Sequence, residues 1–303
     1  MRRGSTSEQG RGIVSLPSKV EGRAVVSRLT GAFLRAILMV AVIIMPSLMV
    51  PGTNTDTAQI VALLALCAGA LTLFEYASTY PGLVEFRDAP PFNRIRFFSL
   101  FAMLFCLSMV ARGQTNPTTA TELVTVVGTL IGQAIDFPYS PVRLIVLMLP
   151  EGASTADIAT LRTAAGMTYL ISLLSLVIFV VALRTSRWPA KGTAFNVWVN
   201  LPTFDPTAGG DVVTRLERDA RFNIALGFLL PFLTPAVIQA ASSLFGSVSV
   251  ANNQTMIWTI TAWAFLPSSL FMRGIAMGRV ATMISTARQK NTRPNKDDAL
   301  VAV

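Results

Sequence analysis

The chain has 303 residues, 52% of them apolar and 14% charged, against about 25% charged in an ordinary soluble domain, so its composition is that of a membrane protein. The formal net charge of +9 does not indicate nucleic acid, because the basic residues stand at the ends of apolar segments and not along one surface. The chain has no histidine, which excludes histidine-ligated haem, histidine-based zinc sites and histidine-assisted nucleophiles within it.

The first third of the chain predicts three membrane spans behind a basic arm. Residues 1–28 are polar and rich in arginine, and we expect them to form a disordered cytoplasmic arm. The region 29–111 holds three strongly apolar segments, which we interpret as transmembrane spans one to three. Turn signals at Pro51-Gly52 and at Pro81-Gly82 separate them.

An amphipathic insert follows at residues 112–153. Apolar residues recur with the helical period from Leu123 to Ile135, then Pro138 and Pro141 end the helix, and a second apolar run stops at Pro150. Neither piece reaches the 20 or so apolar residues that cross a bilayer. We therefore expect an extracytoplasmic insert that is either a helix on the membrane surface or a re-entrant hairpin.

The second half of the chain predicts three more spans. It divides into a fourth span at 154–184, a cytoplasmic loop at 185–221, spans five and six at 222–284, and a basic cytoplasmic tail at 285–303. Ser154 is placed to cap the fourth span. Within the loop, alternation of Phe195, Val197 and Val199 with polar residues indicates a short extended segment.

The distribution of basic residues predicts the orientation. With both termini in the cytoplasm, 22 of the 25 basic residues face inward, and only Arg112, Arg143 and Arg162 face outward. The predicted fold is therefore an all-α, polytopic integral membrane protein with six transmembrane helices and an amphipathic or re-entrant insert between spans three and four. The predicted location is a bacterial inner membrane, with the N- and C-termini cytoplasmic.

Three ionisable residues inside spans are candidates for an intramembrane charge pair. Glu75, Arg35 and Arg273 fall at similar depth near the cytoplasmic side, so Glu75 could pair with either arginine. A buried ionisable group is costly unless it is paired or hydrated. The alternative is that each side chain extends separately to the headgroups, as long arginine side chains commonly do.

Prolines and hydroxyl residues in spans five and six are candidates for a solute pathway. Proline frees backbone carbonyls, which broken transporter helices use to bind ions or substrates. The alternative is that the prolines are structural kinks and that each hydroxyl bonds back to its own helix. The candidate pathway residues are Pro231, Thr234, Pro235, Gln239, Thr259, Pro267 and Ser268.

Two G-x-x-x-G motifs are candidate helix-docking sites. Gly128 and Gly132 lie on the polar face of the insert, and Gly274 and Gly278 lie late in span six. This spacing lets two helix backbones approach closely. Packing within one chain and association between chains are both compatible with it.

No catalytic motif, cofactor fingerprint or metal-binding pattern is found in the sequence, so we predict no enzyme activity, no cofactor and no metal. Five extracytoplasmic acids are scattered without a catalytic spacing: Asp56, Glu122, Asp136, Glu151 and Asp157. The predicted partners are the lipid bilayer, anionic headgroups that attract the basic arm and tail, and another membrane protein or a second copy of the chain. Nucleic acid is not predicted.

Two functions of different classes fit these observations. The first is a non-catalytic accessory, assembly or scaffold component of a membrane complex, favoured by the absence of catalytic motifs and by the surface-lying insert. The second is a small-solute transporter or channel, with a pathway between spans five and six and the insert. An enzyme acting on lipid is a more distant third hypothesis.

Overall fold

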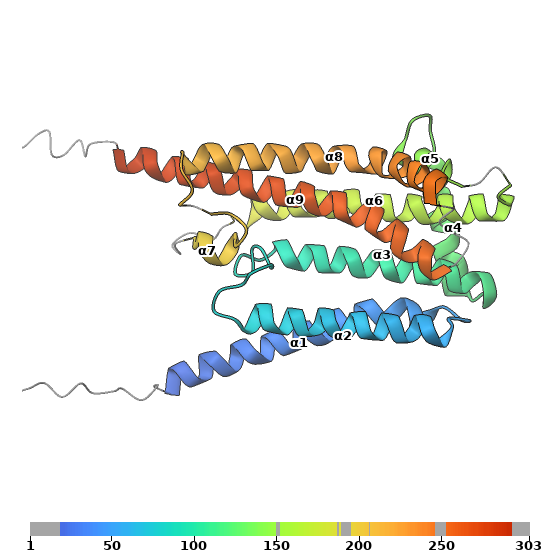
Figure 1. Ribbon diagram of the computed structural model, residues 1–303, viewed down its shortest axis with the longest axis horizontal. Helices are drawn as coiled ribbons and strands as arrows, with labels where there is room; N and C mark the ends of the chain where they lie inside the picture. The colour runs from blue at the N-terminus through green and yellow to red at the C-terminus, as the bar shows by residue number, and fades with distance from the viewer. Residues whose placement is uncertain are drawn as a thin grey trace, which may run out of the picture.

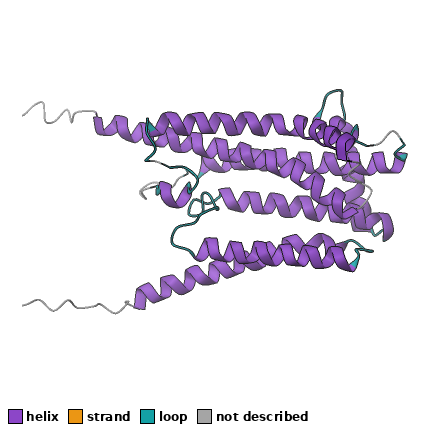
Figure 2. Ribbon diagram, viewed as in Figure 1, coloured by secondary structure: helices purple, strands orange, loops and turns teal. Residues whose placement is uncertain are grey.

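The computed structural model describes residues 19–149, 152–186, 188, 195–205, 207–245 and 253–292. Within these ranges all regular secondary structure is helical, as Figure 2 shows. Six of the helices are long and apolar enough to cross a membrane. The predicted fold class, an all-α polytopic membrane protein with six spans, is therefore confirmed.

The long helices lie side by side along one axis (Figure 1). They are α1 (Lys19–Met49), α2 (Thr55–Ala77), α3 (Phe92–Thr115), α6 (Thr155–Thr185), α8 (Val212–Phe245) and α9 (Asn253–Thr292). Three shorter helices are α4 (Thr119–Ala134), α5 (Pro141–Val146) and α7 (Val197–Asn200).

The two ends of the bundle differ in character. Helix α1 begins and α9 ends at the same end, on the left of Figure 1. We call this the basic end, because it carries Arg28, Arg35, Arg87, Arg96, Arg273 and Arg279. The opposite end carries α4 and α5, and we call it the insert end (Figure 1).

Two helix boundaries differ from the sequence predictions. Helix α1 begins at Lys19, inside the predicted arm, and residues 1–18 lie outside the described residues. Helix α9 continues to Thr292, past the predicted boundary at residue 284, and residues 293–303 lie outside the description. Both helices extend beyond their apolar segments, because charged side chains interrupt a hydropathy pattern without interrupting helical hydrogen bonding.

The predicted extended segment around Val197 is also wrong, because the chain forms the short helix α7 there. The Asn200 side chain donates to the Asn196 carbonyl at 3.0 Å and closes the turn. Val199 and Leu201 are both buried by this turn, so their alternation with polar residues arises from a helical segment packed on the bundle.

Two apolar clusters form the core. One joins α1, α3, α5, α6 and α9 around Met103, Leu107 and Trp263. The other lies toward the basic end, where the Phe86 and Phe92 rings are 4.6 Å apart between centroids. Phe86 belongs to the loop between α2 and α3, so this loop is part of the core.

Helices α1 and α2 form a hairpin at one edge of the bundle, at the bottom of Figure 1. Within the hairpin, a Cβ added to Gly69 would lie 2.5 Å from Val40 Cγ2, so the two helices are tightly packed. The hairpin contacts the rest of the bundle mainly through α1 and α3. Near the insert end the Gln254 side chain of α9 donates to the Pro46 carbonyl at 3.1 Å.

Candidate functional site

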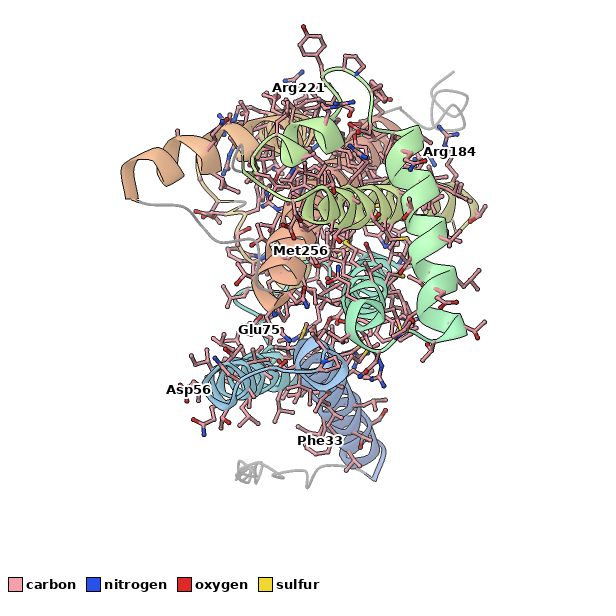
Figure 3. All side chains as sticks on the ribbon, turned by 90° about the vertical axis from the view of Figure 1, so that its right-hand side faces the viewer. Phe33, Asp56, Glu75, Arg184, Arg221 and Met256 are labelled. Carbon is pink, nitrogen blue, oxygen red and sulfur yellow. The ribbon has the colours of Figure 1, made fainter. Side chains whose placement is uncertain are left out.

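Helix α4 lies across the insert end of the bundle. In Figure 3, seen from the insert end, α3 and α6 appear nearly end-on while α4 runs across the view. Figure 1 shows α4 at the ends of the same helices. Its 16 residues are fewer than a span needs. Helix α4 therefore crosses the ends of the long helices and does not run parallel to them.

Glycines set the close contact between α4 and α6. A Cβ on Gly132 would lie 2.7 Å from the Arg162 carbonyl oxygen, and one on Gly166 would lie 2.4 Å from Gly132 Cα. A Cβ on Gly128 would lie 2.8 Å from Thr163 Cγ2. The structure thus brings Gly128 and Gly132, two candidate docking residues, to a helix contact inside the chain.

A buried carboxylate joins the end of the insert to α6. The side chain of Asp136, which follows α4, is 7% exposed and lies 2.6 Å from Arg143 Nε and 2.7 Å from Arg162 Nε. Arg143 belongs to α5 and Arg162 to α6, so one aspartate connects three segments. Sequence reasoning missed this cluster, although two arginines predicted outside the membrane were a signal that an acidic partner was needed.

The face of α4 that points away from α6 is apolar and uncovered by the described chain. Leu123 is 65% exposed and Leu130 62% exposed, and Val126 and Val127 between them are also exposed. The capping box of Thr118 fixes the start of the helix. Helix α4 is therefore a firmly held element with a free apolar row, which we call the α4 row (Leu123, Val126, Val127 and Leu130).

A cavity of about 290 Å³ lies beside α4, between α3, α4 and α6. Its wall includes threonines from α4 and α6 and Gln114 from α3. The Thr129 and Thr163 hydroxyls lie 3.1 Å apart, and the Gln114 amide donates to the Thr160 hydroxyl at 2.9 Å. These polar groups are engaged with one another, and they hold the three helices together.

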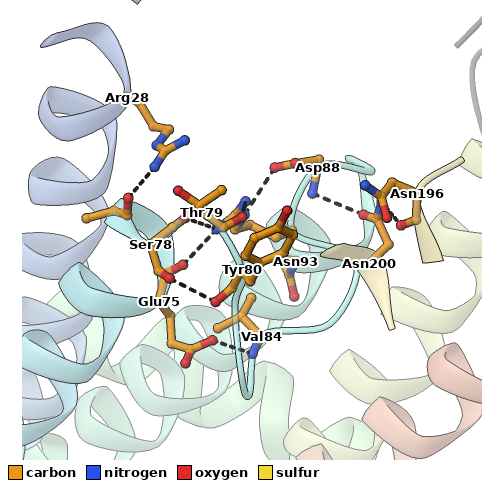
Figure 4. Close-up of polar contacts among 12 residues, drawn as sticks. Arg28, Glu75, Ser78, Thr79, Tyr80, Val84, Asp88, Asn93, Asn196 and Asn200 are labelled. Atoms are coloured by element: carbon orange, nitrogen blue, oxygen red, sulfur yellow. Dashed lines mark hydrogen bonds and ion pairs between the residues drawn. The ribbon is translucent and has the colours of Figure 1, made fainter. Parts of the chain in front are cut away.

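Glu75 is held by backbone amides of the loop that follows α2. The N–H groups of Gly82, Leu83 and Val84 donate to its carboxylate at distances of 2.9 to 3.1 Å. Figure 4 shows the carboxylate turned toward the loop at Val84. Arg87 donates to the Glu75 carbonyl at 3.0 Å and fastens the other side of the loop. Glu75 is 3% exposed, so this contact organises the junction of α2 with the loop.

The candidate charge pair between Glu75 and an arginine is not what the structure assembles. Arg273 lies with its Nε 2.6 Å and its Nη2 2.9 Å from the carboxylate of Glu85 in the same loop. It also donates to Asn223 at 2.9 Å. Arg35 stacks on the Tyr76 ring, with its guanidinium carbon 4.7 Å from the ring centroid. Glu85 reaches Arg273 because the loop folds back into the bundle, which span hydropathy does not reveal.

The candidate pathway residues of α8 and α9 do not line the cavity beside α4. Pro235 leaves the Pro231 carbonyl without its helical donor, and the Trp263 indole of α9 donates to that oxygen at 3.0 Å. The Thr234 and Ser268 hydroxyls donate to carbonyls of their own helices, at 2.7 and 2.9 Å.

The remaining pathway candidates are arranged differently. Pro267 is buried, Thr259 is half-buried and Gln239 is exposed. A Cβ added to Gly227 would lie 2.8 Å from the Pro267 carbonyl oxygen, so α8 and α9 are in close backbone contact there.

The second glycine motif also lies on the contact between α8 and α9. A Cβ on Gly274 would lie 2.7 Å from the Ala220 carbonyl oxygen, and one on Gly278 would lie 3.8 Å from Ala220 Cβ. Near the end of α9, Arg288 donates to Asp211, which precedes α8. This guanidinium, with the Thr214 N–H, holds the pKa of Asp211 below its usual range, so the aspartate is charged at neutral pH.

The described residues form no metal site, and comparison with known proteins assigns no family. Across the described ranges, no group of three or more cysteine, aspartate or glutamate side chains could hold a metal ion. No family model, curated protein or solved structure matches the chain.

Proposed function

We propose that this membrane protein is a non-catalytic accessory or scaffold subunit of a membrane complex, and that the α4 row docks an apolar segment of a partner membrane protein. The observation that carries the proposal is that α4 is fixed across the bundle while its apolar row is free. A preorganised surface loses little conformational entropy on binding, which favours a docking role.

One face of α4 packs against the rest of the chain, and the other face is exposed. The face with Gly128 and Gly132 is used within the chain, as is Asp136 at the end of the helix. The exposed side chains are large and aliphatic, and they are available to pack against another helix. A partner would therefore add contacts without displacing any.

The transporter hypothesis receives less support from the contacts of α8 and α9. A solute path needs polar groups that are free to meet the solute near the bilayer centre. The Thr234 and Ser268 hydroxyls and the Pro231 carbonyl instead have partners within the protein. We accordingly place the function in assembly.

The proposal includes an orientation in a bacterial inner membrane. Cytoplasmic loops are enriched in arginine and lysine, so the basic end faces the cytoplasm and the insert end faces outward. The partner would then meet α4 at the outer membrane surface.

Photocrosslinking tests this function. A photoreactive phenylalanine analogue is placed at Leu130 of the α4 row and, as the control, at Leu147, which is 60% exposed at the same end but belongs to the end of α5. After irradiation in native membranes, we expect a discrete adduct with one membrane protein from position 130 and none from position 147. Leu130→Gln should lower co-purification of that protein at least fivefold, while Leu147→Gln should leave it unchanged. Lipid adducts alone from position 130 would refute the docking role.

A further inference from the structure

An apolar groove runs along the junction between the α1–α2 hairpin and the rest of the bundle. It has a volume of about 450 Å³ and is lined only by apolar residues of α1 and α3, within the range of about 300–1,000 Å³ that small-ligand sites occupy. Helix α1 contributes Leu38, Ala41 and Met45, and α3 contributes Phe97 and Phe101. The groove lies along the junction where α1 of the hairpin meets α3 of the bundle.

Two arginines stand at the end of this groove that is nearer the basic end. Arg35 precedes Leu38 by one turn of α1, and Arg96 directly precedes Phe97 in α3. Both helices run from the basic end toward the insert end (Figure 1), so each arginine precedes the groove residues of its helix on the side of the basic end, which we call the mouth of the groove. The Arg35 guanidinium carbon lies 4.7 Å from the centroid of the Tyr76 ring of α2, and Arg96 also interacts electrostatically with Tyr76.

The guanidinium groups at this mouth keep donors available. Arg96 donates through Nε to the Ser269 hydroxyl at 3.3 Å and lies over the Phe92 ring, and its two terminal nitrogens donate to none of the described residues. Arg35 stacks on Tyr76, and within the described chain it donates no hydrogen bond. Arginine binds phosphate oxygens well because its planar donors match their geometry.

Among the described residues, no carboxylate forms an ion pair with either cation, although Glu85 attracts Arg96 electrostatically. Glu75 is occupied by three backbone amides, and Glu85 by Arg273. Asp88 is 3.2 Å from Arg87. Arg35 and Arg96 therefore present positive charge where an apolar groove opens toward the headgroup region.

We propose that the groove between α1 and α3 binds one anionic phospholipid from the leaflet at the basic end. Its phosphate lies between Arg35 and Arg96, and one acyl chain lies along Leu38, Met45 and Phe101. This site is separate from the α4 row and does not depend on a protein partner. It differs from general attraction of basic segments to a charged membrane because it holds a single lipid by both headgroup and chain.

Native mass spectrometry of the full-length protein tests the site. The protein is purified in mild detergent and mixed with equal amounts of phosphatidylglycerol and phosphatidylcholine carrying identical acyl chains. We expect one tightly retained lipid, with phosphatidylglycerol preferred at least tenfold. Arg35→Gln combined with Arg96→Gln should reduce this preference to about twofold or less. The matched control, Arg184→Gln with Arg221→Gln, removes two exposed arginines from the same chain and should keep the preference.

A second pair of variants tests the acyl-chain part of the site. Ala41 is exposed in the groove, so Ala41→Phe fills the space without disturbing buried packing. It should lower the retention of the lipid at least fivefold. Leu63→Phe, at a position on α2 that is 63% exposed and outside the groove, should not.

The outcomes separate the alternatives. Three results would each overturn the site. The double variant of Arg35 and Arg96 could keep the lipid preference, the control pair could lose it equally, or Ala41→Phe could leave lipid retention unchanged. If the double variant elutes as misfolded protein, Arg35→Gln alone decides, because Arg35 is exposed and its removal leaves the core intact. A loss of preference of at least threefold is then expected, and full retention refutes the proposal.

Discussion

At the scale of single residues, three buried or partly buried carboxylates each hold a loop against the helices. Glu75 binds three consecutive backbone amides, Glu85 binds Arg273 in a bidentate ion pair, and Asp136 holds two arginines. A buried charge is tolerated when such partners replace the water that it loses. Each of these acids therefore determines where a loop joins the helices.

Removing the Glu75 carboxylate should loosen the loop between α2 and α3. Glu75→Ala leaves the N–H groups of Gly82, Leu83 and Val84 without their acceptor, which costs about 1–3 kcal/mol of stability. We expect a lower midpoint of thermal unfolding and faster amide hydrogen exchange at residues 82–84. Glu122→Ala, which removes an exposed carboxylate, is the control and should change neither quantity. Unchanged exchange at 82–84 would show that the amides do not depend on Glu75.

The sequence predicted which residues were unusual but not which residues they contact. Glu75, Arg35 and Arg273 stand out because each is an ionisable side chain in an apolar segment. Their partners depend on how the loop after α2 folds, and that loop has Gly82 and two prolines but no periodic pattern. A contact such as Arg273 with Glu85, which are 188 residues apart, cannot be read from local spacing.

At the scale of elements, small residues decide which helices touch. The contact between α4 and α6 is centred on Gly132 and Gly166, and the contact between α8 and α9 uses Gly227 and Gly274. In a membrane, association between helices relies on close packing, because lipid removes most of the hydrophobic driving force. The positions of the glycines therefore determine which helices pack together more than the positions of the surrounding leucines do.

A single methyl group at the centre of the α4 contact should displace that helix. In Gly166→Ala the new Cβ would fall 2.4 Å from Gly132 Cα, a backbone atom that cannot rotate away. Overpacking of this kind costs about 1–3 kcal/mol. The readout is a disulfide between Thr129→Cys and Thr163→Cys, whose hydroxyls are 3.1 Å apart, with Cys67 and Cys106 replaced by alanine.

We expect this disulfide to form readily in the parent and to fall at least fivefold in the Gly166→Ala background. Gly209→Ala, at a position with no atoms within 4 Å of the added Cβ, is the control and should leave the yield unchanged. An undiminished yield with Gly166→Ala would mean that the contact adapts to the methyl group.

The elements themselves were largely predictable, since the period of the apolar residues and Pro138 and Pro141 outlined both pieces of the insert. The choice between a surface helix and a re-entrant hairpin was not predictable from that pattern. The glycine contacts with α6 and the Asp136 cluster, which hold α4 across the bundle, could not be predicted from it either.

At the scale of the whole molecule, the basic end and the insert end define opposite sides of a membrane. Among the described residues, nearly all arginines and lysines lie in the loops and helix ends at the basic end. The insert end holds three described arginines, each of which contacts a described acceptor. Asymmetry of this kind sets orientation during insertion. The orientation that the charge count predicts therefore does not depend on any particular contact, and it stays a prediction.

Cysteine labelling in intact cells tests the orientation. Asn116→Cys places a thiol in an exposed turn at the insert end, and Thr207→Cys places one in the loop at the basic end, both in a protein lacking its own cysteines. A membrane-impermeant maleimide should label position 116 in intact cells, and position 207 only after the membrane is opened. The reverse result would invert the proposed orientation.

The lengths of α8 and α9 have a mechanical consequence. Helix α9 has 40 residues and α8 has 34, which at 1.5 Å per residue gives about 60 Å and 50 Å, whereas the hydrocarbon layer is only about 30 Å thick. In Figure 1 both helices reach further toward the basic end than α2 or α3. Arg288 and Asp211 join the two helices near their projecting ends. The two helices are therefore held together at the ends that exceed the length of a membrane span, so the part of α9 nearest residue 292 is supported by α8 and does not stand alone.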